Sequence, residues 1–377
     1  MRVYDDKILK SVFITLLGFF LTLQYLTQSA FFDQNPSMKA NLKHYYLMIV
    51  IVIVFLCLPY IIQSTKTIIF TVIMSVFVIL MFHYQSYSDF GVSLLAIYFA
   101  VLVDYKNIIL TDLISRLISL SFIFMTYILG YTHDVMDSRY GMRYAIGFLN
   151  PNGLSVFILI LALEIIWLIR KKSWKVVILV FVSYLLFFIT KSRTDLYALI
   201  LVLPFIFKLN TSKSFIKNKV LSFTIVLFPI VLAFISIYFS MNYDPVAHPF
   251  EYDLNLIFSN RLYLSKFYFN QFPITLFGNS LTNLINGALD SGYVSLLIRG
   301  GIISLFLYLI LVTLTINKYI RSSDNVIKFF VLILIVYSII GIAELSLYQI
   351  NLGLFLIAGL LINTPIREKG KSIKKVR

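Results

Sequence analysis

The feature that most constrains this chain is a succession of long apolar runs with few charged residues between them. Of its 377 residues, 60% are hydrophobic and 13% are charged, whereas soluble domains carry about 25% charged residues. The apolar runs begin near Ile8, Tyr45, Thr67, Asp89, Leu113, Gly153, Val176, Asp195, Val220, Ser291, Val326 and Leu345. The sequence therefore predicts an all-α, polytopic integral membrane protein, a single domain over residues 1–377 with roughly twelve transmembrane helices.

Three of these runs are irregular. The runs at Asp89 and Asp195 are shorter than the others. The run at Leu113 opens beside Asp112 and Arg116. Because charged side chains are costly inside lipid, we expect the start of this run to lie at the membrane interface.

The distribution of Lys and Arg predicts the orientation. Cytoplasmic loops of membrane proteins are rich in basic residues. With the N-terminus inside, the inner segments hold 23 basic residues, Arg116 among them; the outer segments hold 8, and Arg299 completes the 32. The bias predicts a multi-pass plasma-membrane protein with both termini in the cytoplasm. It also accounts for the net charge of +15 without nucleic acid as a partner.

This orientation places three segments of interest on the outer face. They are residues 131–152, the turn 191–195 and a large extracytoplasmic loop over residues 241–290. Loops of that length are rarely passive connections. Within the large loop, Arg261–Phe272 mixes polar and aromatic residues at near-helical spacing, which favours a helix along the membrane interface.

A loop on the outer face combines arginines with a helix start. Arg139 and Arg143 precede Asn150-Pro-Asn152, where a span begins with helix-starting residues. The exposed backbone N–H groups of that start could bind an anion together with Arg143.

Two further arginines lie on the same predicted face, Arg193 in the neighbouring turn and Arg261 in the large loop. Guanidinium groups hold phosphate oxygens in bidentate fashion, which suits a diphosphate. Alternatively, these arginines could contact lipid headgroups or loop carboxylates. The carboxylates in question are Asp134, Asp137, Glu251 and Asp253.

Two charges mark the span that starts near Ser291. Asp290 could act as a general base toward a sugar hydroxyl, or could cap the helix. Arg299 lies about 13 Å further along a helical axis, at a depth where a charge costs about 2.5–3.5 kcal/mol on insertion scales. It could steer a substrate or neutralise a buried partner such as Glu164. We expect Glu344 to be structural or gating.

No metal ion or cofactor is expected. The histidines at positions 44, 83, 133 and 248 match no known metal spacing, and Cys57 is the only cysteine. Asp-x-Asp, Walker-type and Gly-x-Ser-x-Gly motifs are absent from the sequence, so no cytoplasmic nucleotide site is predicted.

Four motifs follow one another between about residues 131 and 311. They are Arg143-Tyr-Ala-Ile-Gly-Phe-Leu-Asn-Pro-Asn-Gly153, Lys191-Ser-Arg-Thr194, Arg261 with Pro273-Ile-Thr-Leu-Phe-Gly278, and Asp290-Ser-Gly-Tyr293 with Gly300-Gly301. In content and order they resemble motifs of the bacterial O-antigen and capsule repeat-unit polymerases (Wzy), which are grouped with the O-antigen ligases. The ligases have a histidine near the position of Asp290, so the difference favours a polymerase.

The resemblance implies a GT-C-like glycosyltransferase, independent of metal ions and nucleotides and inverting at the anomeric carbon. Its reaction would polymerise undecaprenyl-diphosphate-linked repeat units into surface polysaccharide on the outer face of the bacterial plasma membrane. Asp290 would activate the acceptor hydroxyl. The diphosphate would be held by Arg143, Arg193 and Arg261, with Arg139, Asn150, Asn152, Tyr293 and Arg299 in support.

The resemblance also implies partners and leaves two alternatives. The expected partners are the lipid-linked glycan donor and acceptor, membrane lipid, and possible flippase and chain-length regulator proteins. A lipid-linked glycan ligase would use the same donor with another acceptor. A flippase or transporter for the same lipid would predict several charges spread along the spans.

Overall fold

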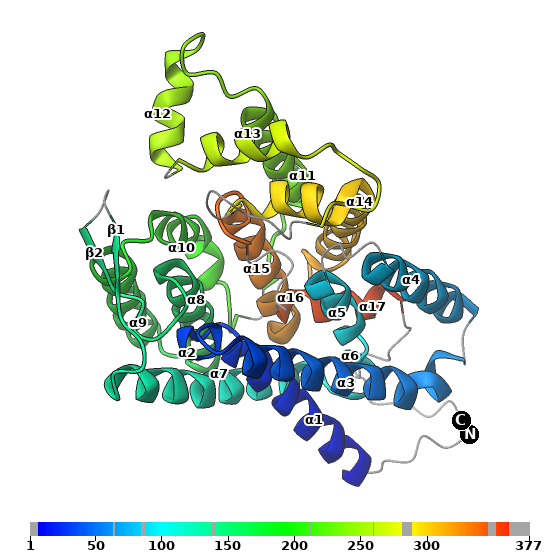
Figure 1. Ribbon diagram of the computed structural model, residues 1–377. Coiled ribbons are helices and arrows are strands. Elements are labelled where there is room, and N and C mark those ends of the chain that lie inside the picture. The colour runs from blue at the N-terminus through cyan, green and yellow to red at the C-terminus, as the bar shows by residue number, and fades with distance from the viewer. Residues whose placement is uncertain are drawn as a thin grey trace, which may run out of the picture.

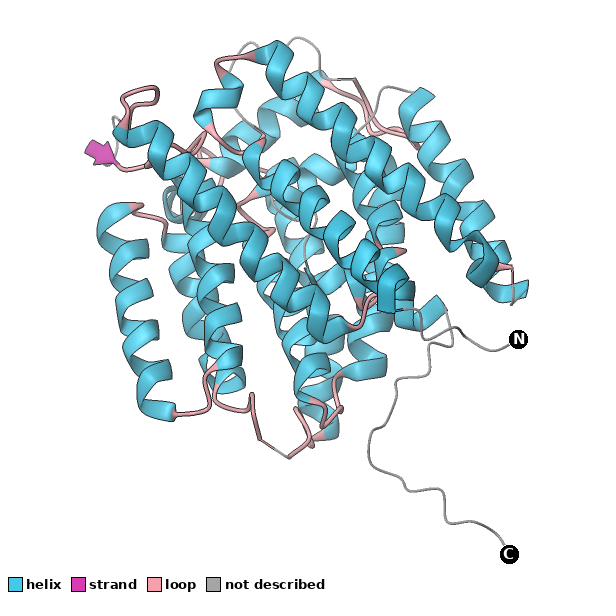
Figure 2. Cartoon of the chain, turned by 90° about the horizontal axis from the view of Figure 1, so that it is seen from below, coloured by secondary structure: helices cyan, strands magenta, loops and turns pink. Residues whose placement is uncertain are grey.

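The computed structural model describes residues 7–62, 65–83, 88–137, 141–211, 213–258, 260–280, 289–345 and 352–361. Arg139 lies outside these described residues. The fold is helical apart from one small β-hairpin (Figures 1 and 2). The first half comprises α1 (Lys7–Leu26), α2 (Ala30–Asp33), α3 (Pro36–Ile61), α4 (Thr65–His83), α5 (Ser88–Ala96), α6 (Phe99–Leu102), α7 (Tyr105–Ile128), β1 (Val135–Asp137), β2 (Gly141–Arg143) and α8 (Pro151–Leu168).

The second half continues with helices of more varied length. They are α9 (Lys172–Tyr184), the π-helix η1 (Leu185–Ile189), α10 (Arg193–Ile206), α11 (Lys219–Met241), α12 (Pro249–Ile257), α13 (Arg261–Gln271), α14 (Gly292–Tyr319), α15 (Asn325–Ile340), α16 (Leu352–Phe355) and α17 (Ala358–Leu361).

The long helices are those of a multi-pass membrane protein. Within the described ranges, seven helices are long and apolar enough to cross a membrane: α1, α3, α7, α8, α9 with η1, α11 and α14. Shorter apolar helical stretches cover 67–80, 90–102 and 325–340. The count of roughly twelve spans stays a prediction: each predicted run coincides with helix where the structure describes it, but the run near Asp195 forms the short α10, and the described part of the run near Leu345 holds α16 and α17.

Burial separates the helices into an inner and an outer set. Large apolar side chains such as Phe55 on α3, Val180 on α9 and Phe234 on α11 are each more than 60% exposed. Such surfaces suit contact with lipid tails. In contrast, α15 is buried along nearly its whole length and packs against α7, α10, α11 and α14 at the centre of the molecule (Figure 1).

The predicted interfacial start of the run at Leu113 is wrong. The helix begins at Tyr105, and both Asp112 and Arg116 lie within it with 0% and 2% exposure. Their charges neutralise one another inside the bundle instead of meeting water. Removing Arg116 from the inner loops leaves the predicted orientation unchanged.

The large loop contains two helices that stand off one end of the bundle, at the top of Figure 1. The predicted helix over Arg261–Phe272 is confirmed as α13, which ends at Gln271. Helix α12 precedes it. Asn260, between them, has a left-handed backbone with φ 65°, and it reverses the chain so that α13 runs back over α11 and α14.

Helix α14 is interrupted at Gly301, and the end of the large loop fills the interruption. Gly301 has φ 79° and ψ 177°. The N–H of Ile302 donates to the carbonyl of Thr275 at 3.0 Å, and the N–H of Asn279 donates to the carbonyl of Ile298 at 2.9 Å. A Cβ on Gly278 would lie 1.9 Å from the carbonyl oxygen of Arg299. The Phe-Gly and Gly-Gly motifs therefore form one packed unit.

Candidate functional site

The loop before α8 is held in one conformation by its own polar groups. The carboxylate of Asp134 accepts hydrogen bonds from the N–H groups of Ala145 and Ile146, at 2.9 and 3.2 Å. Gly147 follows with φ 84°, and a Cβ there would lie 2.5 Å from the carbonyl oxygen of Ile123. Only glycine fits this position. The Gly-Phe motif therefore fixes the path from β2 into α8.

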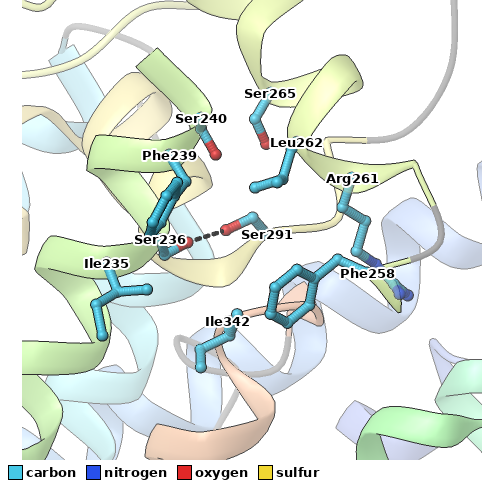
Figure 3. A pocket seen from close by; sticks show the side chains of 10 residues that line it. All are labelled: Ile235, Ser236, Phe239, Ser240, Phe258, Arg261, Leu262, Ser265, Ser291 and Ile342. Carbon is cyan, nitrogen blue, oxygen red and sulfur yellow. Dashed lines mark hydrogen bonds between the residues drawn. The ribbon is translucent and has the colours of Figure 1, made fainter. Parts of the chain in front are cut away.

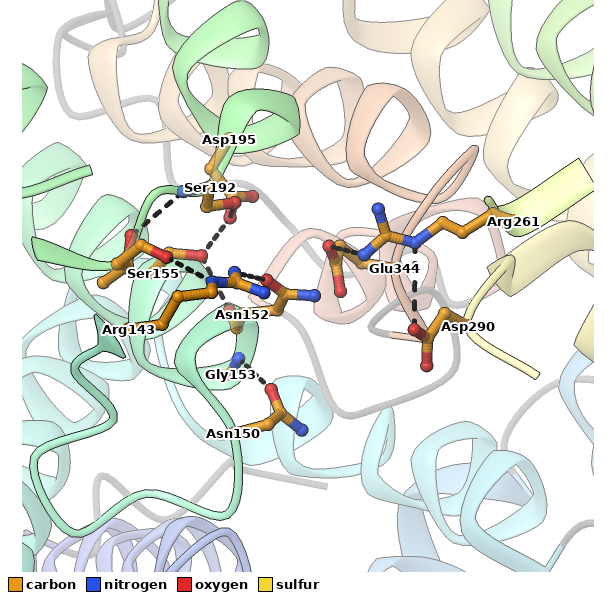
Figure 4. Close-up of polar contacts among 11 residues, drawn as sticks. Arg143, Asn150, Asn152, Gly153, Ser155, Ser192, Asp195, Arg261, Asp290 and Glu344 are labelled. Carbon is orange, nitrogen blue, oxygen red and sulfur yellow. Dashed lines mark hydrogen bonds and ion pairs between the residues drawn. The ribbon is translucent and has the colours of Figure 1, made fainter. Parts of the chain in front are cut away.

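Arg143, the last residue of β2, connects this loop to the turn before α10. Its side chain is 8% exposed. Nε donates to the carbonyl of Thr190 at 3.0 Å, and Nη2 donates to Oδ1 of Asn152 at 2.5 Å (Figure 4). Two motifs that are separate in the sequence thus meet at one guanidinium group.

The start of α8 offers fewer N–H groups than the sequence suggested. Asn150 is the N-cap, and its Oδ1 accepts the N–H of Gly153 at 2.6 Å. Pro151 has no N–H to offer. The N–H of Gly153 is therefore not free to bind an anion, contrary to expectation. The positive charge at this helix start comes mainly from Arg143.

The first turn of α10 contributes a carboxylate that sequence reasoning missed. Asp195 is fully buried, and its Oδ2 accepts hydrogen bonds from the hydroxyls of Ser192, at 2.6 Å, and Ser155 (Figure 4). Its Oδ1 has no hydrogen-bond partner among the described residues. Arg193 is the first residue of α10, and its side chain is exposed. The turn thus presents Asp195, not Arg193, to the interior.

Arg261, the first residue of α13, lies between two carboxyl groups. Its side chain is 7% exposed. Nη2 contacts Oε1 of Glu344 at 2.6 Å, and Nε lies 3.9 Å from Oδ2 of Asp290. The alternative that Arg261 pairs with a carboxylate of the loops, such as Glu251 or Asp253, is therefore wrong. Its partners Asp290 and Glu344 lie near the ends of α14 and α15. Glu251 instead accepts the N–H of Asp244 at 2.6 Å.

Glu344 occupies the centre of the site. Figure 4 shows it between the group around Arg143 and Asp195 and the pair formed by Arg261 and Asp290. Burial raises the pKa of Glu344 to about 8, although Arg261 acts in the opposite direction. At neutral pH the carboxyl group is therefore mostly neutral and accepts from Arg261 through an uncharged oxygen. The charge of Arg261 is only partly compensated.

Charge interactions link the group around Arg143 and Asp195 with the group around Arg261 and Asp290. Arg143 and Arg261 both interact with Asp195 and with Glu344. Asp290 also acts on Glu344. The site therefore combines two buried guanidinium groups with three carboxyl groups, one of them mostly neutral. Such a site is suited to an anionic ligand that replaces the carboxyl contacts of the arginines.

The remaining predicted residues have other surroundings. Tyr293 is fully buried, and its hydroxyl donates to the carbonyl of Ser338 at 2.9 Å, so it supports packing. Arg299 lies at the break of α14, near Tyr268. Its suggested pairing with Glu164 is wrong, because Glu164 lies 3.5 Å from Arg116 instead.

A pocket opens beside Arg261, with about 300 Å³ of empty space that includes its open mouth (Figure 3). Four buried serines face it: Ser236, Ser240, Ser265 and Ser291. The hydroxyls of Ser236 and Ser291 are 2.9 Å apart. Apolar walls come from Ile235, Phe239, Phe258, Leu262 and Ile342. Arg261 contributes to one wall of this pocket.

Among the described residues, no group of three or more His, Cys, Asp and Glu side chains is placed to hold a metal ion. Comparison of the chain with protein-family models, with curated proteins and with solved structures finds no match. The chemistry of the site is therefore interpreted from its own geometry.

Proposed function

We propose that this protein polymerises undecaprenyl-diphosphate-linked oligosaccharide repeat units on the outer face of a bacterial plasma membrane. One observation carries the proposal: Arg143 and Arg261, from distant parts of the chain, meet at one buried site within a bundle of apolar helices. A lipid-linked diphosphate has the matching chemistry, since its prenyl chain belongs in lipid and its phosphates pair with guanidinium groups. The four sequence motifs that resemble the polymerase family support the same assignment.

The two arginines would act on the leaving group. As the glycosyl–phosphate bond breaks, negative charge develops on the departing diphosphate. Arg143 and Arg261 would stabilise that charge in a site from which water is largely excluded. Because the glycosyl–phosphate bond itself supplies the energy, the reaction would need no nucleotide, and the resemblance to the polymerases implies that it needs no metal ion.

Asp290 would act on the acceptor. Its side chain is 33% exposed, whereas that of Glu344, the other carboxyl group in contact with Arg261, is 9% exposed. This position allows a hydroxyl of a second lipid-linked repeat unit to approach. The carboxylate would draw off the hydroxyl proton as the oxygen attacks the anomeric carbon, which gives inversion.

Glu344 would make room for the diphosphate. In the structure its carboxyl group holds Arg261 at 2.6 Å, where a phosphate oxygen would bind. A ligand phosphate would take over this contact, and the displaced carboxyl group would stay protonated among like charges. With Glu344 neutral, the two arginines balance the carboxylates of Asp195 and Asp290, whereas an ionised Glu344 would give the site a net negative charge that repels a diphosphate.

The decisive assay incubates purified full-length protein in detergent with lipid-linked repeat units and no nucleotide. We expect chain lengthening for the native protein. Arg261→Gln should slow it by about 100-fold or more, because one charge-stabilising group is lost. Lys266→Gln removes a charge from the same helix outside the site and should leave the rate within about twofold.

Lengthening by Arg261→Gln at the native rate, with normal protein abundance, would contradict the proposed role. A product in which the glycan is transferred once to a different acceptor would identify a ligase. The expected association with a flippase and with chain-length regulator proteins is a further proposal, to be checked by co-purification.

A second candidate function is supported by one observation. A transporter predicts charges within the spans, and Asp112, Arg116 and Glu164 lie within α7 and α8. Intramembrane ionisable residues often mark transport pathways. A transporter would move the lipid-linked glycan across vesicle membranes without lengthening it, which the same purified protein in vesicles can test.

A further inference from the structure

A second buried cluster of charges lies within the bundle, on residues that the proposed reaction does not use. Arg116 of α7 contacts Oδ2 of Asp112 through Nε at 2.8 Å and Oε1 of Glu164 at 3.5 Å. The hydroxyl of Tyr25 on α1 donates to the other oxygen of Asp112. The guanidinium carbon lies 4.4 Å from the ring centre of Tyr25. All three charged side chains are at most 2% exposed.

The two carboxyl groups of this cluster are not equivalent. Asp112 receives hydrogen bonds from Arg116 and from Tyr25, so both of its oxygens are satisfied. Glu164 is held less well: Nε of Arg116 lies 3.5 Å from its Oε1, and neither Oε1 nor Oε2 has a hydrogen bond of good geometry among the described residues. An ionised carboxylate that is buried without donors is strongly disfavoured, and such a group takes up a proton instead.

The charge balance leads to the same conclusion. The groups that face Glu164 are Asp112 and Arg116 from α7, Tyr25 from α1 and Tyr337 from α15. Among them Arg116 carries the only positive charge, and Asp112 already neutralises it. With Glu164 ionised, the cluster would hold one uncompensated negative charge inside the membrane-spanning region.

We propose that the cluster is a proton-binding site, in which Glu164 carries one proton beside the ion pair of Arg116 and Asp112. Taking up H⁺ from water breaks no other bond and leaves the cluster electrically neutral. A metal cation fits less well, because the guanidinium group lies between the two carboxyl groups and repels it, and a metal ion requires several oxygen ligands. A proton requires only one.

This proton has a defined place in the fold. The cluster involves α1, α7, α8 and α15, and α7 packs against each of the other three helices. Asn150 caps α8 and Asn152 lies in its first turn, while α15 ends four residues before Glu344. The bound proton thus stabilises the packing of the helices that carry the candidate site, whatever reaction that site performs.

Infrared difference spectroscopy of the purified full-length protein tests the proposal. Glu164→Gln imitates the neutral acid, so we expect this variant to fold and to lack one carboxylic-acid C=O band at pH 7. Glu344→Gln, made as a control, should remove a different band that disappears above about pH 8 in the native protein. If Glu164→Gln removes a carboxylate band instead, Glu164 is ionised and the proposal is overturned.

A second variant keeps the test valid if Glu164→Gln does not fold. In Asp112→Asn, Arg116 loses its counterion, and Glu164 should give up its proton to replace it, so that the Glu164 acid band disappears. If the native protein shows no carboxylic-acid band that depends on Glu164, the proposal is overturned. A thermal midpoint that rises with added Na⁺ but not with choline would also overturn it, by identifying a metal ion as the ligand.

Discussion

At the scale of single residues, the charge state of Glu344 decides how the site receives an anion. Its pKa of about 8 means that the carboxyl group is mostly neutral below that pH and ionised above it. Once ionised, it holds Arg261 as a full ion pair and repels phosphate oxygens. Ligand affinity should therefore be high below pH 8 and fall as the pH rises through this value.

Calorimetry with farnesyl diphosphate, a soluble prenyl diphosphate, measures this dependence. For the native protein we expect affinity to weaken by about tenfold for each pH unit above 8, because binding then requires proton uptake. Glu344→Gln should bind with no such dependence. If the native protein and Glu344→Gln show the same pH profile, Glu344 does not compete for Arg261.

The residues around the site show what sequence reasoning can and cannot reach. Arg143 and Arg261 were identifiable because few basic residues fall on the predicted outer face, and each of these two lies in one of the four motifs. Asp195 and Glu344 were missed as partners because nothing in their local sequence reports a contact between distant segments. Arg193 was taken as a ligand, yet residues two apart on a helix face different sides, so Asp195 turns inward and Arg193 outward.

At the scale of elements, the interrupted helix α14 and residues 275–279 stabilise each other. Gly278 has φ 87° and touches the carbonyl of Arg299, so Gly278→Ala introduces both backbone strain and a clash. We expect a loss of stability of about 4 kcal/mol or more. Thermal unfolding in detergent measures it.

Gly130→Ala is the matched control for this change. Gly130 also has a positive φ, 78°, but a Cβ there meets nothing within 4 Å. Only strain remains, and the expected loss is about 1–2 kcal/mol. Equal losses in the two variants would show that the packing of the loop against α14 contributes nothing.

Apolar length predicted the helices well, because a spanning helix must satisfy its backbone internally wherever it meets lipid. The same rule does not predict the structure where a helix is surrounded by other parts of the protein instead of lipid. The break at Gly301 was not expected, since its freed backbone groups find partners in a loop that is distant in sequence. The position of Asp112 and Arg116 was misjudged for a similar reason, because each supplies the charge that the other needs.

At the scale of the whole molecule, the orientation in the membrane is a prediction that labelling can test. Cys57 is fully buried, so the native chain should react little with an impermeant maleimide. Cysteine introduced at exposed Asn270 on α13 should be labelled in intact cells. Cysteine at exposed Lys217, before α11, should be labelled only after permeabilisation. The reverse pattern would place the candidate site on the cytoplasmic side and remove the proposed substrate.

The attachment of the large loop has a mechanical consequence. Pulling residues 275–279 away from α14 would leave the carbonyl of Ile298 and the N–H of Ile302 without partners beside apolar helices. Each orphaned group would cost several kcal/mol in a non-aqueous layer. This end of the loop therefore behaves as a fixed anchor.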